Sequence, residues 1–127
     1  MLLASSPSPE WAAVYAARTV PPVGFRVLTA PETVTFGSIV EDGVTVAIGR
    51  GVVTRGWLGI AAMEVRPEHR RRGLAKRILR GLLAWGAERG ATRCYIQAEA
   101  TNTAALALYK GHGFKPHHLY RMRQVIG

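Results

Sequence analysis

The sequence lacks long apolar segments and is poor in cysteine and in acidic residues. Its single cysteine, Cys94, excludes an intrachain disulfide and suits a reducing compartment. No segment reaches the roughly 20 apolar residues that span a bilayer, and the first ten residues lack the basic flank of a signal peptide. We therefore expect a soluble, cytoplasmic protein with no membrane partner. The 127 residues, 48% of them hydrophobic, predict a single domain over 1–127 that opens with a short lead and helix at 1–23.

The shortage of acidic residues leaves a net charge of +9, much of it concentrated in one stretch. Between residues 66 and 93 only Glu68 and Glu88 are acidic. The basic residues there are Arg66, Arg70, Arg71, Arg72, Lys76, Arg77, Arg80, Arg89 and Arg93. Such a concentration attracts polyanions, whether nucleic acid, an anionic surface or a phosphorylated small molecule. Charge taken alone favours a solvent-exposed basic face that serves solubility. The local sequence motif therefore has to decide between such a face and an anion-binding site.

Residue patterns predict strands and helices over most of the chain. Helices are expected over 10–18 with Ser8 as N-cap, over 74–89 with Gly90 past its end, and from Asn102 or Thr103 to Gly111 or Gly113. Strands are expected at 25–28, 34–40, 44–53, 57–66, 93–98 and 119–125, with a hairpin turn at Asp42-Gly43. This order predicts an α/β (α+β) fold in which helices flank a mixed, mainly antiparallel central sheet.

The segment from Val65 to Ala75 joins a predicted strand to a predicted helix and carries three consecutive arginines before Gly73. A helix N-terminus has backbone N–H groups without intrahelical partners, and its dipole favours an anion. Glycine lets a ligand approach the backbone closely, and guanidinium groups pair well with phosphate. The segment therefore predicts a pyrophosphate cradle. It is neither a P-loop nor a dinucleotide fingerprint, because Gly-Lys-Ser/Thr and GxGxxG are absent.

Two blocks resemble the signatures of the GNAT N-acetyltransferase superfamily. Arg70-x-x-Gly73-x-Ala75 is similar to its Arg/Gln-x-x-Gly-x-Gly/Ala motif, and Val65-x-Pro67 sits where the family has its coenzyme-binding strand. Downstream, the stretch 102–109 (NTAALALY) and then Gly113-Phe114 resemble its second signature, in the right order and at the usual separation. The resemblance covers roughly residues 34–123. It implies an acetyl-CoA-dependent N-acetyltransferase, an acyltransferase in which a primary amine attacks the thioester directly.

The resemblance also assigns roles to individual residues. The backbone of Met63, Glu64 and Val65 would pair with the pantetheine arm of the co-substrate acetyl-CoA, as an added strand does. The residues implied around the pyrophosphate are Arg70, Arg71, Arg72, Gly73, Leu74, Ala75 and Lys76. Asn102 would hydrogen-bond the coenzyme near the thioester. Tyr109 would protonate the leaving thiolate, the alternative being a core aromatic on an apolar helix.

The general base is left open by the residues themselves. Members resembling the acetyltransferases of ribosomal-protein N-termini carry a glutamate on the strand before the asparagine, where this chain has Gln97. Glu99 lies two residues further along, on the same strand face. Glu64 is the other candidate, and either could act through water. For both, the alternative is an ordinary hydrogen-bonded or surface carboxylate.

Other polar residues point to no second chemistry. His112, His117 and His118 lack a cluster of ligands at metal-binding spacing, so no metal is expected. We expect Cys94 to be a buried structural thiol and His69 to be exposed at the surface, the alternative for His69 being a contact with the phosphates. No nucleic-acid-binding motif accompanies the basic charge, which makes nucleic acid a disfavoured partner.

The sequence departs from the family in its shortened N-terminal part, because one short helix precedes the first long strand. A homodimer partner or an additional domain could complete the acceptor side, or the site could be open for a peptide terminus. Two other functions fit less well: an acyl-CoA-binding module with little catalytic activity, and an acetyltransferase or binder acting on RNA.

Overall fold

The computed structural model of the chain describes residues 1–16, 33–97, 103–113, 115–118 and 121–125. They form a seven-stranded sheet in the order β1-β2-β3-β4-β5-β7-β6. The strands are β1 (Leu2–Ala4), β2 (Thr33–Glu41), β3 (Val44–Thr54), β4 (Trp57–Val65), β5 (Arg93–Gln97), β6 (Lys115–His118) and β7 (Arg121–Val125). Only β4 and β5 pair in parallel, and every other neighbouring pair is antiparallel. This confirms the predicted mixed, mainly antiparallel sheet.

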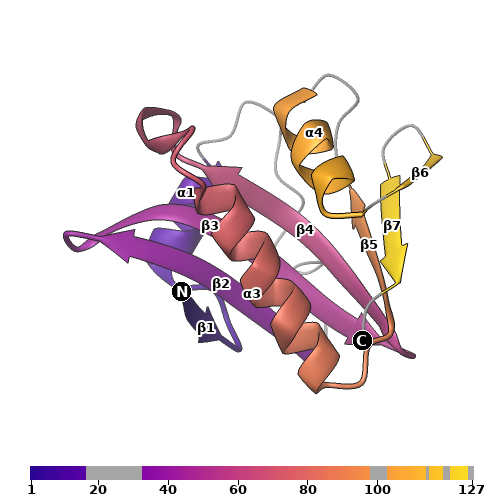
Figure 1. Cartoon of the computed structure of the whole chain (residues 1–127). Helices are drawn as coiled ribbons and strands as arrows, with labels where there is room; N and C mark the ends of the chain where they lie inside the picture. Colours follow the sequence, from indigo (N-terminus) through magenta and orange to yellow (C-terminus); the bar gives the residue numbers. More distant parts are fainter. Residues whose placement is uncertain (17–32, 98–102, 114, 119–120, 126–127) are drawn as a thin grey trace.

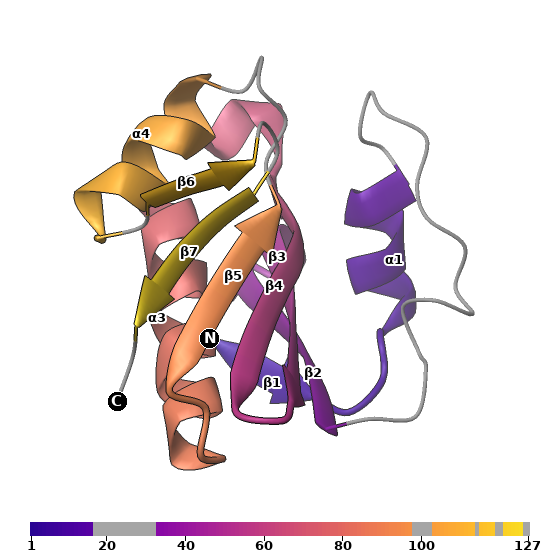
Figure 2. The same ribbon diagram turned by 90° about the vertical axis from the view of Figure 1, so that its right-hand side faces the viewer.

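Helices cover both faces of the sheet. Helix α1 (Pro9–Ala16) lies on one face, and α3 (Leu74–Glu88) and α4 (Thr103–Gly111) lie on the other, as Figure 2 shows. A short 3₁₀ helix, η1 (Pro67–His69), links β4 to α3. The larger core lies between α3 and the sheet, where Ile78, Leu79 and Leu82 pack in one cluster with Leu58 and Ile60.

Glycines allow α3 to lie close to the sheet. A Cβ at Gly49 of β3 would lie 2.5 Å from Cγ2 of Ile78, and a Cβ at Gly86 of α3 would lie 2.8 Å from a methyl group of Leu58. Any larger side chain at these positions would push the helix away. The close approach places α3, and with it the turn that precedes the helix, against the sheet.

Helix α1 is held by its own cap and by one buried indole. The Ser8 hydroxyl accepts the backbone N–H of Trp11 at 3.0 Å, as expected of an N-cap. The Trp11 side chain is 1% exposed, and its Nε1 donates to the carbonyl of Gly37 at 3.0 Å. Together with Phe36 and Ile48 of the sheet, Trp11 forms a second, smaller core on this face.

Most of the predicted elements are present. Strands β2 to β5 and helices α1, α3 and α4 match their predicted ranges within two residues where the structure describes them, and Asp42 and Gly43 both have positive φ, at 50° and 77°. Gly90, at φ 84°, lies past the end of α3 as predicted. The strand predicted at 25–28 lies outside the described residues, and the strand predicted at 119–125 is described from Arg121.

Strand β1, which pairs with β2 at the edge of the sheet, was not predicted. Strand β6 was missed as well. Both are short edge strands, of three and four residues, and neither is long enough to display an alternating pattern.

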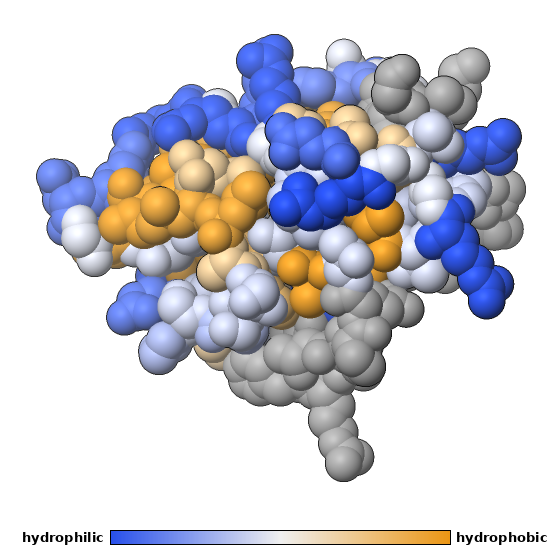
Figure 3. Space-filling view, turned by 90° about the horizontal axis from the view of Figure 1, so that it is seen from below, coloured by the Kyte–Doolittle hydropathy of each residue, from blue (hydrophilic) through white to orange (hydrophobic). Residues whose placement is uncertain are grey.

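The surface mixes apolar and charged areas, which Figure 3 shows side by side on the face seen from below. Large apolar side chains that stay exposed include Leu2 and Leu3 on β1 and Val40 and Val44 at the β2–β3 turn. In the described part of the chain, no helix combines the length and the apolar character that crossing a membrane requires.

Candidate functional site

The parallel strands β4 and β5 separate partway along their length. Their pairing runs from Trp57 opposite Arg93 to Ile60 opposite Ile96 and ends there, while β4 continues to Val65. In Figure 1 the two strands diverge toward their carboxyl ends, with α4 beside the gap. Within the described ranges, residues 61–65 therefore have β3 on one edge and no strand on the other. Such an edge can pair with an extended ligand as a further strand would.

A β-bulge lies at the start of this open edge. Ile48 pairs with Glu64 and Arg50 with Ala61, so two residues of β4, Ala62 and Met63, lie opposite one residue of β3. Ala62 has φ 56°, which is uncommon for a residue with a Cβ. Bulges redirect the side chains that follow them.

After the bulge, neighbouring side chains of β4 lie on opposite faces of the sheet, as in any strand. Met63 packs against the core on the α3 side, and Ala62 packs against the core on the α1 side. Glu64 is the cross-strand neighbour of Ile48, which belongs to the α1-side core. Because directly paired residues share a face of the sheet, Glu64 lies on the α1 side. At the open edge, the Glu64 side chain thus lies on the α1 side of the sheet and the Met63 side chain on the α3 side.

The Tyr109 hydroxyl lies at the open edge on the α3 side. Tyr109 belongs to α4, is 4% exposed, and its hydroxyl donates to Sδ of Met63 at 3.8 Å. Burial, and to a smaller extent the negative charge of Glu64, raises the pKa of Tyr109 to about 12. The residue is therefore a neutral hydroxyl at neutral pH, positioned where β4 and β5 part.

The turn before α3 presents unpaired backbone N–H groups. Gly73 has φ 76° and ψ 14°, no side chain caps the helix, and its first hydrogen bond runs from the N–H of Arg77 to the carbonyl of Gly73 at 3.1 Å. The N–H groups of Leu74, Ala75 and Lys76 have no acceptor among the described residues. A Cβ at Gly73 would meet no atom within 4 Å, so the turn is open. This geometry suits an anion.

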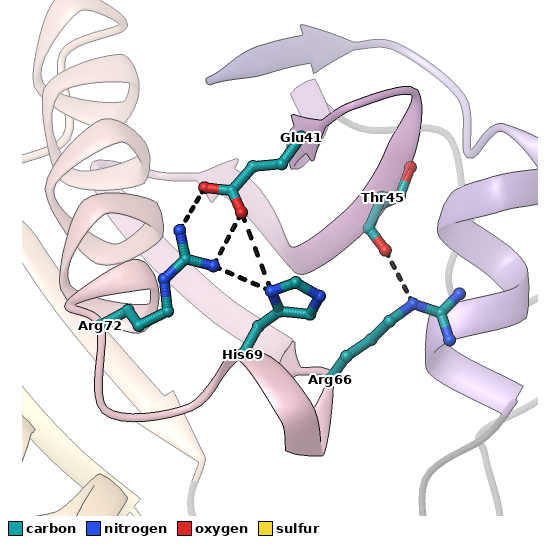
Figure 4. Close-up of polar contacts among 5 residues, drawn as sticks. All are labelled: Glu41, Thr45, Arg66, His69 and Arg72. Atoms are coloured by element: carbon teal, nitrogen blue, oxygen red, sulfur yellow. Dashed lines mark hydrogen bonds and ion pairs between the residues drawn. The ribbon is translucent and has the colours of Figure 1, made fainter.

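The three arginines of the turn have different surroundings. Arg70 is tied to β4: its Nε donates to the carbonyl of Val65 at 3.3 Å, and its Nη2 lies 3.6 Å from Oε1 of Glu64. Arg72 reaches Glu41 of β2 with both terminal nitrogens (Figure 4). Arg71 forms no hydrogen bond or ion pair with the described residues, and its own φ is 62°. Of the three arginines predicted to bind phosphate, Arg70 and Arg72 are therefore already engaged by groups of the sheet.

The structure brings most of the predicted site residues together. The open edge of β4 holds Met63, Glu64 and Val65, with Tyr109 in contact with Met63, and residues 70–76 form the turn and the start of α3. Asn102 and Glu99 lie outside the described residues. Cys94 is 0% exposed, and burial raises its pKa to about 12, which confirms the prediction of a buried structural thiol. Among the described residues, no group of three or more His, Cys, Asp or Glu side chains could hold a metal ion.

The sequence did not predict that Glu41 and His69 contact Arg72. The His69 side chain is 28% exposed and is therefore less exposed than predicted. Its Nδ1 lies 2.8 Å from Nη1 of Arg72. Glu41 precedes Arg72 by 31 residues in the chain, and no spacing rule links the two. The only sequence signal is the Asp42-Gly43 turn, which ends β2 and leaves Glu41 at its tip.

Comparison with known proteins identifies relatives. The family model described as "Probable histone acetyltransferase Rv0428c C-terminal" matches residues 1–123. The probable histone acetyltransferase Rv0428c of Mycobacterium tuberculosis is 34% identical over 133 residues, which cover 98% of this chain and 41% of that protein. The N-acetyltransferase YobR of Bacillus subtilis is 32% identical over 96 residues, covering 74% and 39%. The chain thus spans about two fifths of the length of these relatives.

Solved structures share the fold. The ribosomal-protein-S18-alanine N-acetyltransferase from Escherichia coli superposes with a TM-score of 0.81 at 19% identity, covering 99% of this chain and 94% of that chain. The PaiA N-acetyltransferase from Thermoplasma acidophilum, in complex with coenzyme A, superposes with a TM-score of 0.67 at 14% identity, covering 80% and 65%. At these identities, the likeness establishes the architecture.

Proposed function

Because this chain belongs to the GNAT N-acetyltransferases, within the family described as probable histone acetyltransferase Rv0428c C-terminal, we propose that it transfers an acetyl group from acetyl-CoA to a primary amine. One observation carries the proposal. The unpaired N–H groups that begin α3, the open edge of β4 and the Tyr109 hydroxyl all lie at the carboxyl end of β4. Each feature suits one part of acetyl-CoA. The N–H groups suit the diphosphate, the strand edge suits the extended arm with its amides, and the hydroxyl suits the leaving thiolate.

Binding of acetyl-CoA would use backbone groups more than side chains. The N–H groups of residues 71–76 would hold the pyrophosphate, with the helix dipole adding to the attraction. The peptide groups of Met63, Glu64 and Val65 would pair with the amides of the pantetheine arm. Asn102 would hydrogen-bond the coenzyme near the thioester. The coenzyme A complex of the Thermoplasma neighbour supports this choice of co-substrate.

The reaction would be direct attack of a neutral amine on the thioester carbonyl carbon. A C–N bond forms, the C–S bond breaks, and the nitrogen loses a proton. Glu64 could receive that proton through water from the α1 side of the sheet, and Glu99 is the alternative base. The coenzyme A thiolate leaves beside Tyr109, whose hydroxyl donates to the developing charge from the α3 side.

The proposal is tested at Gly73. In Gly73→Asp, a carboxylate within about 4 Å of the bound pyrophosphate costs about 4 kcal/mol at the effective dielectric of a protein surface. Isothermal titration calorimetry with coenzyme A should then show an affinity at least about 100-fold lower than that of the unmodified protein.

The control is Gly56→Asp, in the β3–β4 turn. Gly56 has φ 79° against 76° for Gly73, and a Cβ at either position meets no atom within 4 Å. The two variants therefore place a Cβ at a similar left-handed φ and add the same charge, and only the one at Gly73 should lose the coenzyme. Equal coenzyme affinity in the two variants would refute the cradle.

Gln97, where related enzymes carry a glutamate, favours a second function, an acyl-CoA-binding module. It predicts binding of acetyl-CoA with no release of free thiol across a panel of small amines and peptides. Thiol release with any acceptor in that panel would exclude the module and identify the acceptor class.

A further inference from the structure

The turn that carries the cradle is attached to the β2–β3 hairpin by a bidentate ion pair. Nη1 of Arg72 donates to Oε1 of Glu41 at 2.7 Å, and Nη2 donates to Oε2 at 2.8 Å. Figure 4 shows the Arg72 side chain extending from the start of α3 to Glu41, with His69 beside both. His69 adds a contact of 2.8 Å from its Nδ1 to Nη1 of Arg72. Since arginine can only donate, Nδ1 is the acceptor in this contact.

The turn needs such an attachment because of its own backbone. Arg71 and Gly73 both have left-handed φ values, 62° and 76°, and the left-handed region is disfavoured for a residue with a Cβ such as Arg71. The attachments flank Arg71: Arg70 binds the end of β4, and Arg72 binds the end of β2. The turn is thus fixed to the sheet on both sides of its disfavoured residue.

Arg72 could instead be read as a phosphate ligand for which Glu41 merely competes. The geometry favours attachment, because both terminal nitrogens of the guanidinium are occupied by one carboxylate and Nη1 is also in contact with His69. The hydrogen bonds from Arg72 are the largest cause of the lowered pKa of Glu41, and the positive charges of Arg72 and Arg77 lower it further. Glu41 therefore stays ionised and paired at neutral pH.

We propose that Glu41 is a positioning residue: through Arg72 it holds the turn in the shape that aims the N–H groups of Leu74, Ala75 and Lys76 at the coenzyme pyrophosphate. This inference rests on the proposed binding of coenzyme A. It concerns a residue of the β2–β3 hairpin that lies outside the sequence motifs of the coenzyme site.

Charge and positioning predict opposite signs for Glu41→Gln. Loss of a carboxylate makes the protein more positive and releases Arg72, so charge alone would tighten the binding of the polyanionic coenzyme. Loss of positioning should instead raise the Kd for coenzyme A about threefold to fivefold, in the range of a well-formed surface pair. The KM for acetyl-CoA should rise with it while kcat stays unchanged.

Glu88→Gln is the matched control. Glu88 is an exposed carboxylate at the far end of α3 whose contact with Arg89 is long, at 3.8 Å, so the substitution makes the same change in net charge away from the cradle. Its Kd should equal that of the unmodified protein or fall slightly.

A charge exchange completes the test. Glu41→Arg and Arg72→Glu should each weaken binding of coenzyme A in calorimetry, although they change the net charge in opposite directions. The double variant, with the pair reversed, should recover most of the affinity. Amide exchange of residues 74–76 in the free protein should accelerate in Glu41→Gln and stay unchanged in Glu88→Gln.

The outcomes separate the two proposals. If the unmodified protein does not bind coenzyme A, both fail. If it binds coenzyme A but Glu41→Gln binds as tightly or more tightly, or the exchanged pair restores nothing, the positioning role is overturned and the proposed function stands.

Discussion

Replacing Tyr109 by phenylalanine tests the chemistry while leaving the fold in place. The change removes one hydroxyl, which donates to the thioether of Met63 at 3.8 Å, a weak acceptor, and it keeps the ring of a residue that is 4% exposed. The lost bond to Met63 is worth about 1 kcal/mol at most, and removing a buried hydroxyl recovers part of it. We therefore expect the Tm to shift by only a few degrees.

The effect on turnover should be much larger. A positioned general acid contributes about 10² to 10⁴-fold. With a pKa of about 12, Tyr109 is a weaker acid than a thiol in water, whose pKa is about 8.5, and this places the contribution at the low end of that range. An expected loss of about 100-fold in kcat corresponds to about 2.7 kcal/mol of transition-state stabilisation.

The assay follows free thiol release from acetyl-CoA, with coenzyme A affinity measured separately by calorimetry. Tyr109→Phe should lower kcat about 100-fold and leave the Kd nearly unchanged. Tyr109→Ala separates the two roles, since it also removes the ring from the core. If Tyr109→Phe turns over like the unmodified protein and only Tyr109→Ala is impaired, Tyr109 is a packing residue and the acid role is refuted.

Two predictions concern stability. Burial raises the pKa of Cys94 from 9.0 to about 12 and that of Tyr109 from 10.0 to about 12, so the unfolded chain loses these protons first and stability falls as the pH rises from about 9 toward 12. Urea unfolding should give a free energy about 3 kcal/mol lower at pH 10.5 than at pH 8, and Cys94→Ala should remove most of that difference; an undiminished difference would contradict the burial argument. Gly49→Ala places a Cβ 2.5 Å from Ile78 and should cost about 1 to 3 kcal/mol by overpacking, lowering the Tm in a calorimetric scan. Gly111→Ala, where a Cβ meets nothing within 4 Å, should leave the Tm unchanged or higher, and equal Tm values for the two variants would refute the close approach of α3.

The sequence predicted those parts of the fold that depend on local patterns. The hairpin at Asp42-Gly43 and the helix of α3 follow from turn chemistry and helical spacing, and both are present. Strand β1 was missed because three residues cannot display an alternating pattern, and its pairing with β2 depends on contacts more than 30 residues away.

The site was predicted in its parts but not in its geometry. The Gly73 turn and Tyr109 could be found from motifs, since each motif is contiguous in the chain. The bulge at Ala62, which shifts the alternation of side chains along β4, and the pair between Glu41 and Arg72 arise from the register of segments distant in the chain. Apart from the Asp42-Gly43 turn, which leaves Glu41 at the end of β2, no sequence pattern near these residues indicates them.

The central claim is that the N–H groups opening α3 and the free edge of β4 bind one coenzyme A molecule together. Titration of isotopically labelled protein with coenzyme A, followed by amide chemical shifts, tests it directly. The account predicts large, saturable shifts for Leu74, Ala75 and Lys76 and for residues 63–65, at one shared affinity, with Gly56 unmoved. Saturable binding that shifts other amides and leaves the start of α3 unchanged would contradict it.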